Sequence, residues 1–198
     1  MGSCEARFVL AGIFVGGASE RMGGTAKGLL MAPGGESIVS RCCRVLAKAG
    51  VSEIVLVGRN PAYASFRLEA IDDRPAGVGP IGGILAMLEH ARGAPCIAIA
   101  CDMPYVTEAL VGKMIRAPAA PVTAPRRAHR WEPLFARYDA CVLPVARRNV
   151  SAGVYSLQRL LAEAGAAMLP ISDDEREALD DWDTPEDVSR ERTDGPTR

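Results

Sequence analysis

The sequence lacks several features that would point to a zinc or iron–sulfur protein, a secreted protein or a membrane-spanning one. Its six cysteines form no C-x-x-C pair, and the two histidines, His90 and His129, stand apart from them, so the spacing of a zinc or iron–sulfur site is missing. We therefore expect the cysteines to be small buried hydrophobic residues. No apolar run approaches the length of a membrane span. The start has neither the charged residues nor the long apolar core of a signal peptide, and a cytosolic, or cytoplasmic, protein is expected.

An excess of positive charge is also missing. The 23 lysine and arginine residues are balanced by 24 aspartate and glutamate residues. Proteins that bind nucleic acid or a membrane surface usually carry an excess of Lys and Arg, so neither partner is expected. With 198 residues, of which 48% are hydrophobic, the chain is long enough to bury a sizeable core. We expect one domain over residues 1–188, followed by a polar tail over 189–198.

What is present is a regular alternation of apolar runs and helical patterns. The predicted strands cover residues 8–15, 53–58, 69–73, 95–101, 122–124, 132–137 and 167–171. The predicted helices cover residues 37–49, 81–91, 107–115, 140–149 and 154–164. The strands over residues 8–15 and 95–101 are apolar throughout. Such strands alternating with helices indicate an α/β protein whose mostly parallel sheet is covered on both faces.

A glycine-rich segment, FVGGASERMGGTAKGLL, follows the first predicted strand directly. Its glycines let main-chain N–H groups approach phosphate oxygens, and the cations of Arg21 and Lys27 neutralise phosphate charge. The Walker pattern is excluded, because Gly28 follows the lysine and Met22 stands where the first glycine would fall. The segment therefore predicts a polyphosphate site of another kind.

A second candidate is Asp102, which ends the most apolar strand and precedes the turn expected at Pro104. Ligands of open parallel sheets bind beyond the carboxyl ends of the strands, and Mg²⁺ prefers one or two carboxylates together with phosphate oxygens. The alternative is an aspartate that only caps the helical region beginning near Thr107. The nearby phosphate segment favours the metal ligand.

Other candidates allow two interpretations each. Asp72 and Asp73 close a third strand and either bind a ribose hydroxyl or a base edge, or are simply solvated. Gly82 and Gly83 either let a helix N-terminus approach a ligand or pack that helix closely on the sheet. Residues 77–82 match G-x-G-x-x-G, but they do not directly follow a strand, so dinucleotide binding is not favoured. A set of arginines either binds an anionic substrate or is solvated: Arg126, Arg127, Arg130, Arg147 and Arg148.

Taken in order, these motifs resemble those of the nucleotidyltransferases related to molybdenum cofactor guanylyltransferase. That family's first motif, L-A-G-G-x-S-x-R-M-G-x-x-K, corresponds to the segment from Phe14 to Lys27. The remaining motifs correspond to Asp73, Gly79 to Gly83, Cys101-Asp102-Met103-Pro104, and Asp181 to Asp187. The resemblance implies a Rossmann-like three-layer α/β/α fold. It also implies an enzyme that binds a nucleoside triphosphate and Mg²⁺, transfers the nucleoside monophosphate to a phosphorylated acceptor and releases pyrophosphate.

The resemblance and the charges of these residues together assign the expected roles. Arg21, Lys27 and Asp102 are the expected catalytic residues, with Asp102 as the Mg²⁺ ligand. Expected nucleotide contacts are Val15, Gly16, Gly17, Ser19, Lys27, Asp73, Gly82 and Gly83, and expected acceptor contacts are Arg126, Arg130 and Asp183. The Gly-Gly pair is typical of the guanylyl branch, so GTP and molybdopterin or molybdenum cofactor are the expected substrates, with transient contact to molybdoenzymes. The alternatives are a CTP-dependent or other nucleotidyltransferase, and a non-catalytic nucleotide-binding partner of a molybdoenzyme.

Overall fold

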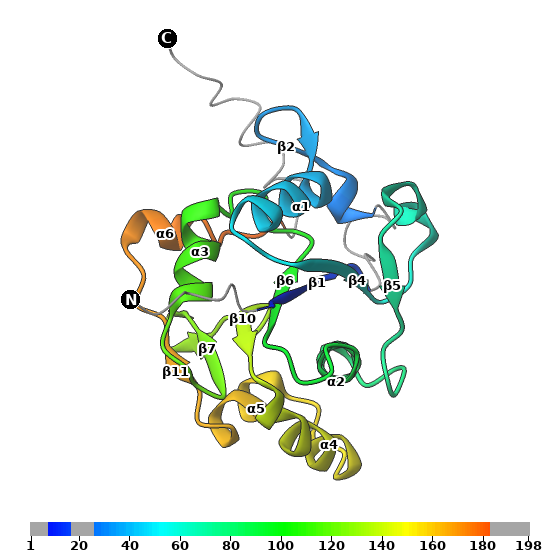
Figure 1. Ribbon diagram of the computed structural model, residues 1–198, viewed down its shortest axis with the longest axis vertical. Helices are drawn as coiled ribbons and strands as arrows, with labels where there is room; N and C mark the ends of the chain where they lie inside the picture. The colour runs from blue at the N-terminus through cyan, green and yellow to red at the C-terminus, as the bar shows by residue number, and fades with distance from the viewer. Residues whose placement is uncertain (1–7, 17–25, 183–198) are drawn as a thin grey trace.

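A central seven-stranded sheet organises the part of the chain that the computed structural model describes, residues 8–16 and 26–182 (Figure 1). Its strands are β1 (Leu10–Phe14), β4 (Glu53–Val57), β5 (Glu69–Ile71), β6 (Cys96–Ala100), β7 (Val122–Ala124), β10 (Phe135–Tyr138) and β11 (Ala167–Met168). They lie in the order β11-β7-β10-β6-β1-β4-β5. Every neighbouring pair is parallel except those that involve β10, which runs antiparallel to β6 and to β7. The prediction of a mostly parallel sheet is confirmed.

Helices cover both faces of this sheet, as the sequence predicts. One face carries α1 (Ile38–Lys48) and α3 (Glu108–Arg116), and the other carries α2 (Pro80–His90), α4 (Leu143–Ser151) and α5 (Leu157–Glu163) (Figure 1). Alternate residues of β1 serve the two layers: Ala11 and Ile13 pack with α1 and α3, whereas Leu10 and Phe14 pack with α2. This alternation explains why β1 and β6 are apolar at every position.

The predicted helices are confirmed with small shifts at their ends. Ser37 caps α1 by accepting a hydrogen bond from the Ser40 N–H, and Thr107 caps α3 by accepting one from the Leu110 N–H. The helix predicted over residues 154–164 begins only at Leu157, after its cap Ser156. The one predicted over 140–149 divides into a 3₁₀ turn, η4 (Ala140–Val142), and α4.

Several short elements carry too little periodicity to be predicted. They are the hairpins β2–β3 (Met31–Ala32 with Glu36–Ser37) and β8–β9 (Arg126–Arg127 with Arg130–Trp131), the 3₁₀ turns η2 (Lys27–Leu29) and η3 (Pro61–Phe66), and the short helix α6 (Asp173–Glu177). The β8–β9 turn places Ala128 and His129 at positive φ, of 43° and 69°, where glycine or asparagine is the usual signal. Its sequence therefore gave no sign of a hairpin.

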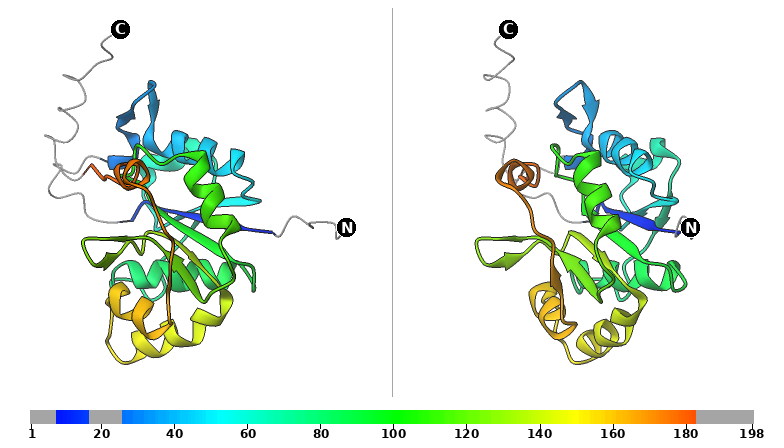
Figure 2. Two further views of the ribbon diagram at one scale, coloured as in Figure 1. Left: turned by 90° about the vertical axis from the view of Figure 1, so that its left-hand side faces the viewer. Right: turned by 60° about the vertical axis from the view of Figure 1, so that its left-hand side comes forward.

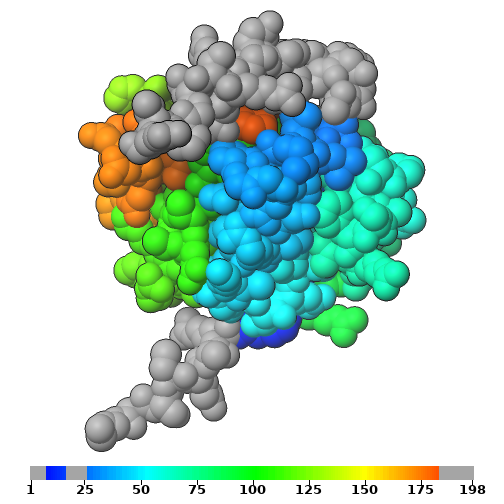
Figure 3. All heavy atoms as spheres, turned by 90° about the horizontal axis from the view of Figure 1, so that it is seen from above, coloured from blue at the N-terminus to red at the C-terminus, as the bar shows by residue number. Residues whose placement is uncertain are grey.

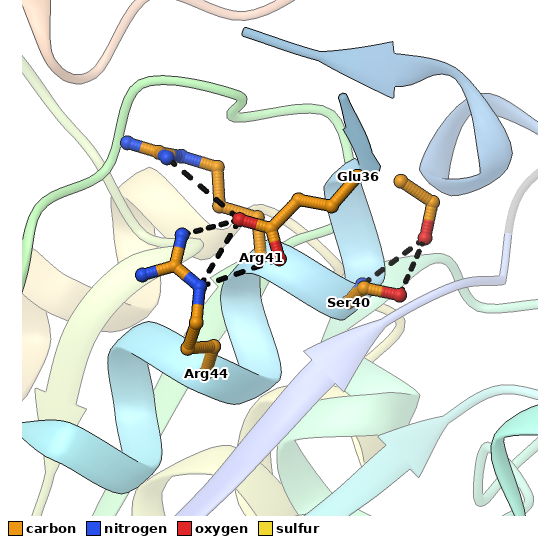
Figure 4. A network of polar contacts seen from close by, with 5 residues as sticks. Glu36, Ser40, Arg41 and Arg44 are labelled. Carbon is orange, nitrogen blue, oxygen red and sulfur yellow. Dashed lines mark hydrogen bonds and ion pairs between the residues drawn. The ribbon is translucent and has the colours of Figure 1, made fainter. Parts of the chain in front are cut away.

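The β2–β3 hairpin is fastened to α1 by charge. Glu36 accepts hydrogen bonds from Arg44 and lies 4.0 Å from Arg41, as Figure 4 shows. The hydrogen bond from Arg44 lowers the pKa of Glu36 below its usual value. In the space-filling view of this face, α1 and the hairpin occupy the centre, with α3 on one side of them (Figure 3).

The cysteines follow the expectation only in part. Cys42 and Cys96 are buried, Cys43 and Cys101 are half-buried, and Cys141 is exposed, so the last is a correction. Cys141 is exposed because it belongs to the η4 turn at the surface, where Val142 is the buried residue. Cys4 lies outside the described residues. Within residues 8–16 and 26–182, no helix is long and apolar enough to cross a membrane.

Candidate active site

A cavity of about 430 Å³ opens at the carboxyl ends of the central strands. Its lining comes from the ends of β1, β4, β5 and β6, from the start of α2, from η2 and from the residue before β10. The lining residues are Phe14, Val15, Gly16, Lys27, Val57, Asp73, Gly77, Gly79, Pro80, Ala100, Cys101, Asp102 and Leu134. The chain proceeds from β1 to β4 and β5 on one side and then returns to β6 on the other side of β1. The cavity therefore lies where the strand order reverses, which is the usual ligand site of an open α/β sheet.

The two strongest sequence candidates meet in this cavity. The Nζ atom of Lys27 lies 3.4 Å from Oδ2 of Asp102, although 75 residues separate them. Lys27 begins the η2 turn, and Asp102 follows β6. Their side chains remain 17% and 20% exposed, so both are available to a ligand in the cavity. A partly exposed carboxylate beside a cation suits Mg²⁺ bound together with a polyphosphate, because phosphate oxygens and water complete the coordination shell of Mg²⁺.

The structure separates Asp73 from Asp72. The carboxylate of Asp72 accepts two hydrogen bonds from the guanidinium of Arg59, at 2.8 and 3.0 Å, and is not part of the cavity lining. Asp73 lines the cavity, with its carboxyl group close to Gly16 and Gly83. Burial raises the pKa of Asp73 above its usual value, and the negative charge of Asp72 adds to this shift. Asp73 is therefore the member of the pair that can contact a ligand.

Gly82 and Gly83 are buried inside α2 and are absent from the cavity lining. A Cβ atom at Gly82 would lie 2.6 Å from the carbonyl oxygen of Pro75, and one at Gly83 would lie 2.7 Å from both Phe14 and Val57. Close packing of α2 on the sheet accounts for both glycines. At this helix N-terminus, the cavity is lined by Gly79 and Pro80 instead.

One contact at the end of β1 was not predicted from the sequence. Gly58, which follows β4, approaches the main chain of Gly16 so closely that a Cβ atom on Gly58 would lie 2.7 Å from the Gly16 Cα. The N–H groups of Val15 and Gly16 both donate to the Val57 carbonyl, at 2.9 and 3.3 Å. These contacts hold the chain where it enters the glycine-rich segment. A glycine directly after an apolar strand was the available signal for Gly58.

Four predicted site residues, Gly17, Ser19, Arg21 and Asp183, lie outside the described residues, and their roles stay predictions. Gly16 and Lys27, which flank the first three in sequence, both line the cavity. Asp183 follows Trp182 in sequence, and the main-chain N–H of Trp182 donates to the main-chain carbonyl of Asp102 at 2.9 Å.

The five arginines do not form one patch. Arg127 is paired with Glu132 and Asp180, at 2.7 and 2.8 Å. On α4, Arg147 pairs with Glu89 and Arg148 with Glu163.

Arg126 and Arg130 are exposed on the β8–β9 hairpin, which follows the carboxyl end of β7 and extends beyond the sheet (yellow-green in Figure 2). Arg126 lies over the ring of Trp131, 4.8 Å from its centre, and donates to the His129 carbonyl. His129 is exposed. Two of the predicted anion-binding arginines therefore stand at the same edge of the sheet as the cavity.

One group of three possible metal ligands exists among the described residues, and it lies elsewhere. Glu53 and Glu69 begin β4 and β5, and His90 ends α2, so the group occupies the opposite edge of the sheet from Asp102. The His90 ring nitrogens lie 3.3 Å from Glu53 and 3.8 Å from Glu69. This group cannot contact a ligand in the cavity.

Comparison with known proteins agrees with this geometry. Residues 11–168 match the family model of the MobA-like NTP transferase domain. The chain is 34% identical to the probable molybdenum cofactor guanylyltransferase of Opitutus terrae, over 96% of this chain and 98% of that protein. It is 32% identical to the molybdenum cofactor guanylyltransferase of Pseudomonas putida, over 88% and 92%.

Among solved structures, molybdopterin-guanine dinucleotide biosynthesis protein A from Archaeoglobus fulgidus superposes with a TM-score of 0.73 at 26% identity, covering 91% of this chain and 95% of that chain. The predicted nucleotidyltransferase fold is confirmed. The chain belongs to the MobA-like NTP transferase family and is a nucleotidyltransferase.

Proposed function

We propose that the protein transfers GMP from GTP to the phosphate of molybdopterin or molybdenum cofactor, releasing pyrophosphate and forming the guanine dinucleotide form of the cofactor. One observation carries this proposal. The Nζ atom of Lys27 lies 3.4 Å from Oδ2 of Asp102, in the cavity where the strand order reverses. The names of the relatives from O. terrae and P. putida support the choice of nucleotide and acceptor.

Charge accounts for the reaction, because nucleotidyl transfer needs positioning and neutralisation rather than a covalent intermediate. Lys27, together with Arg21 and Ser19, binds the β- and γ-phosphates and stabilises the leaving pyrophosphate. Asp102 is the residue that would hold Mg²⁺, which supplies positive charge at the phosphates when bound. An oxygen of the acceptor phosphate attacks the α-phosphorus in line. The bond from that phosphorus to the β-phosphate's bridging oxygen breaks, and pyrophosphate leaves with the electron pair.

Asp73 is the residue we assign to the base. The Watson–Crick edge of guanine presents two adjacent N–H donors, at N1 and at the N2 amino group, and a carboxylate can accept from both. Cytosine has only the N4 amino donor on this edge, so it offers no such pair. Asp73 lies in the cavity beside Gly16, at the end of β1, which is consistent with a base bound next to the Val15-Gly16 main chain. This complementarity favours GTP over CTP.

The acceptor is assigned to the β8–β9 hairpin, which stands at the same edge of the sheet as the cavity. Arg126 and Arg130 are exposed there, and guanidinium groups bind phosphate oxygens well. The proposal also includes Asp183 among the acceptor contacts.

A nucleotide panel with molybdopterin as acceptor tests the proposal by pyrophosphate release. We expect turnover with GTP, and expect Asp102→Ala and Lys27→Ala to abolish it without loss of folding. Asp72→Ala is the matched control for Asp102→Ala. It also removes a carboxylate that follows a strand of the sheet, but this carboxylate is paired with Arg59 outside the cavity. Its turnover should stay within about twofold of the unmodified protein, since an exposed ion pair contributes little.

Three outcomes would contradict the proposal. Full transfer by folded Asp102→Ala would exclude the metal-ligand role. A preference for CTP would make the protein a cytidylyltransferase. GTP binding in calorimetry without turnover on any acceptor would indicate a non-catalytic nucleotide-binding partner of a molybdoenzyme.

A further inference from the structure

One buried hydroxyl group connects the two chain segments that carry Lys27 and Asp102. The Tyr63 hydroxyl accepts a hydrogen bond from the Gly28 N–H at 3.0 Å, and Gly28 directly follows Lys27. The same hydroxyl donates to the Sγ atom of Cys101 at 4.0 Å, and Cys101 directly precedes Asp102. Tyr63 is 2% exposed and is not part of the cavity lining.

The η2 turn, which carries Lys27, packs closely against α1 and Tyr63 at Gly28. A Cβ atom on Gly28 would lie 2.5 Å from Val39 of α1 and 3.0 Å from the ring and hydroxyl of Tyr63. The turn is closed by the Leu30 N–H, which donates to the Lys27 carbonyl at 3.0 Å. The η2 turn therefore rests directly on Tyr63, and only a glycine allows that approach.

Tyr63 is itself held in place by the η3 turn. Asn60 caps this turn by accepting from the Ala62 N–H at 3.0 Å, and the Tyr63 N–H donates to the Asn60 carbonyl at 3.1 Å. The ring packs against Phe66, with 6.2 Å between centroids. Burial raises the pKa of the Tyr63 hydroxyl, so it stays protonated and can donate and accept at once. Burial likewise raises the pKa of the Cys101 thiol, to about 11.

We propose that Tyr63 is a positioning residue for nucleotidyl transfer, whose hydroxyl fixes the Lys27 turn relative to the Cys101–Asp102 segment. Lys27 has a long side chain, so the geometry of the cation depends on where its main chain is anchored. Without the hydroxyl, the Gly28 N–H loses its partner in a buried position, and the turn is free to shift. The inference rests on the proposed function of the cavity, since it concerns the alignment of phosphates by Lys27.

The test is a double-mutant cycle between Tyr63→Phe and Lys27→Ala. We expect Tyr63→Phe to lower kcat for GMP transfer by about tenfold to a hundredfold, the size of effect that a misplacement near 1 Å produces. We expect it to weaken the binding of inorganic tripolyphosphate, measured by calorimetry with Mg²⁺, in the same direction. The cycle is closed on binding, because Lys27→Ala is expected to have no turnover. In the Lys27→Ala background, Tyr63→Phe should not weaken tripolyphosphate binding further, because it acts through the lysine.

Tyr138→Phe is the matched control. Tyr138 is also fully buried, and its hydroxyl donates to a main-chain carbonyl, that of Pro133, at 2.8 Å. Both variants should lose similar thermal stability, but only Tyr63→Phe should affect tripolyphosphate binding. Asn60→Ala is a second variant, which removes the cap of the η3 turn and changes no residue of the cavity lining. It should weaken tripolyphosphate binding when Lys27 is intact and have no further effect in the Lys27→Ala background.

The outcomes separate this inference from the proposed function. Binding by Tyr63→Phe equal to that of the unmodified protein, or losses that add to those of Lys27→Ala, would overturn the positioning role. If the unmodified protein binds tripolyphosphate but transfers no GMP, the proposed function fails while the binding cycle still decides the role of Tyr63. If it binds no tripolyphosphate at all, both fail.

Discussion

Replacing Gly58 by alanine tests the close approach of β4 to the entrance of the glycine-rich segment. Gly58 has φ of 87°, and a Cβ atom there would lie 2.7 Å from the Cα and 2.8 Å from the N of Gly16. Those atoms are main chain and cannot rotate away. Gly50 is the matched control, because it has φ of 95° and nothing within 4 Å of an added Cβ. The two substitutions share backbone strain and differ in the clash.

The expected magnitudes follow from these two terms. Left-handed backbone strain costs an alanine about 1–2 kcal/mol, which is the whole loss expected for Gly50→Ala. Gly58→Ala adds an overpacking cost of about 1–3 kcal/mol, for a total of about 2–5 kcal/mol. In a chain of this length, each kcal/mol lowers Tm by about 2–4 °C, so we expect losses of about 2–8 °C for Gly50→Ala and about 4–20 °C for Gly58→Ala.

The functional consequence separates the two variants further. The clash is relieved only when the main chains of Gly58 and Gly16 move apart. Because Gly16 lines the cavity, GTP binding should weaken in Gly58→Ala and stay unchanged in Gly50→Ala. Thermal unfolding and calorimetry with GTP, both well below Tm, measure the two effects. Equal stability losses in the two variants, or unchanged GTP affinity in Gly58→Ala, would refute the reasoning.

Three further predictions concern other parts of the fold. Arg137→Met should lower the free energy of unfolding by about 3–5 kcal/mol in urea titrations, because the buried guanidinium donates to main-chain carbonyls at and beyond the end of α3. The control, Arg147→Met, removes an exposed ion pair and should cost under about 1 kcal/mol. Equal losses in the two variants would contradict this prediction. Burial raises the pKa of the Asp73 carboxyl in the folded protein above its value in the unfolded chain. The free energy of unfolding therefore falls as the pH rises from the lower of these pKa values to the higher one, and the loss of stability remains at higher pH. Asp73→Asn should therefore be more stable at pH 7 in thermal unfolding, yet bind GTP about tenfold to a hundredfold more weakly; lower stability at pH 7 would reject the burial argument. Finally, iodoacetamide at pH 7.5 should alkylate exposed Cys141 well before Cys101, whose thiol pKa is about 11, and peptide mass spectrometry showing the reverse order would contradict this.

Local patterns were sufficient for the larger elements. The central strands β1 and β6 are apolar on both faces, and helices begin after side chains such as Ser37 and Thr107 that can cap them. Two-residue strands could not be predicted in this way, because they are too short to show the alternation of polar and apolar residues. The turn of the β8–β9 hairpin gave no signal either, since Ala128 and His129 are not typical of positive φ.

For the charged residues of the site, too, the sequence predicted some features and the fold determined others. Lys27 and Asp102 could be selected from the sequence, because each lies in a motif beside an apolar strand, and the charge of each suits phosphate or Mg²⁺. Their 3.4 Å separation, by contrast, depends on the strand order, which places β6 beside β1 and which no local pattern encodes.

Tertiary structure also decided between interpretations that the sequence left open. It assigned Asp72 to Arg59 and Asp73 to the cavity, and it explained Gly82 and Gly83 by packing rather than by contact with the cavity. It brought the Tyr63 hydroxyl between two segments that are far apart along the chain. Sequence patterns report each residue's chemistry and local periodicity, whereas close packing between distant segments arises only when the whole sheet and its two helical layers have assembled.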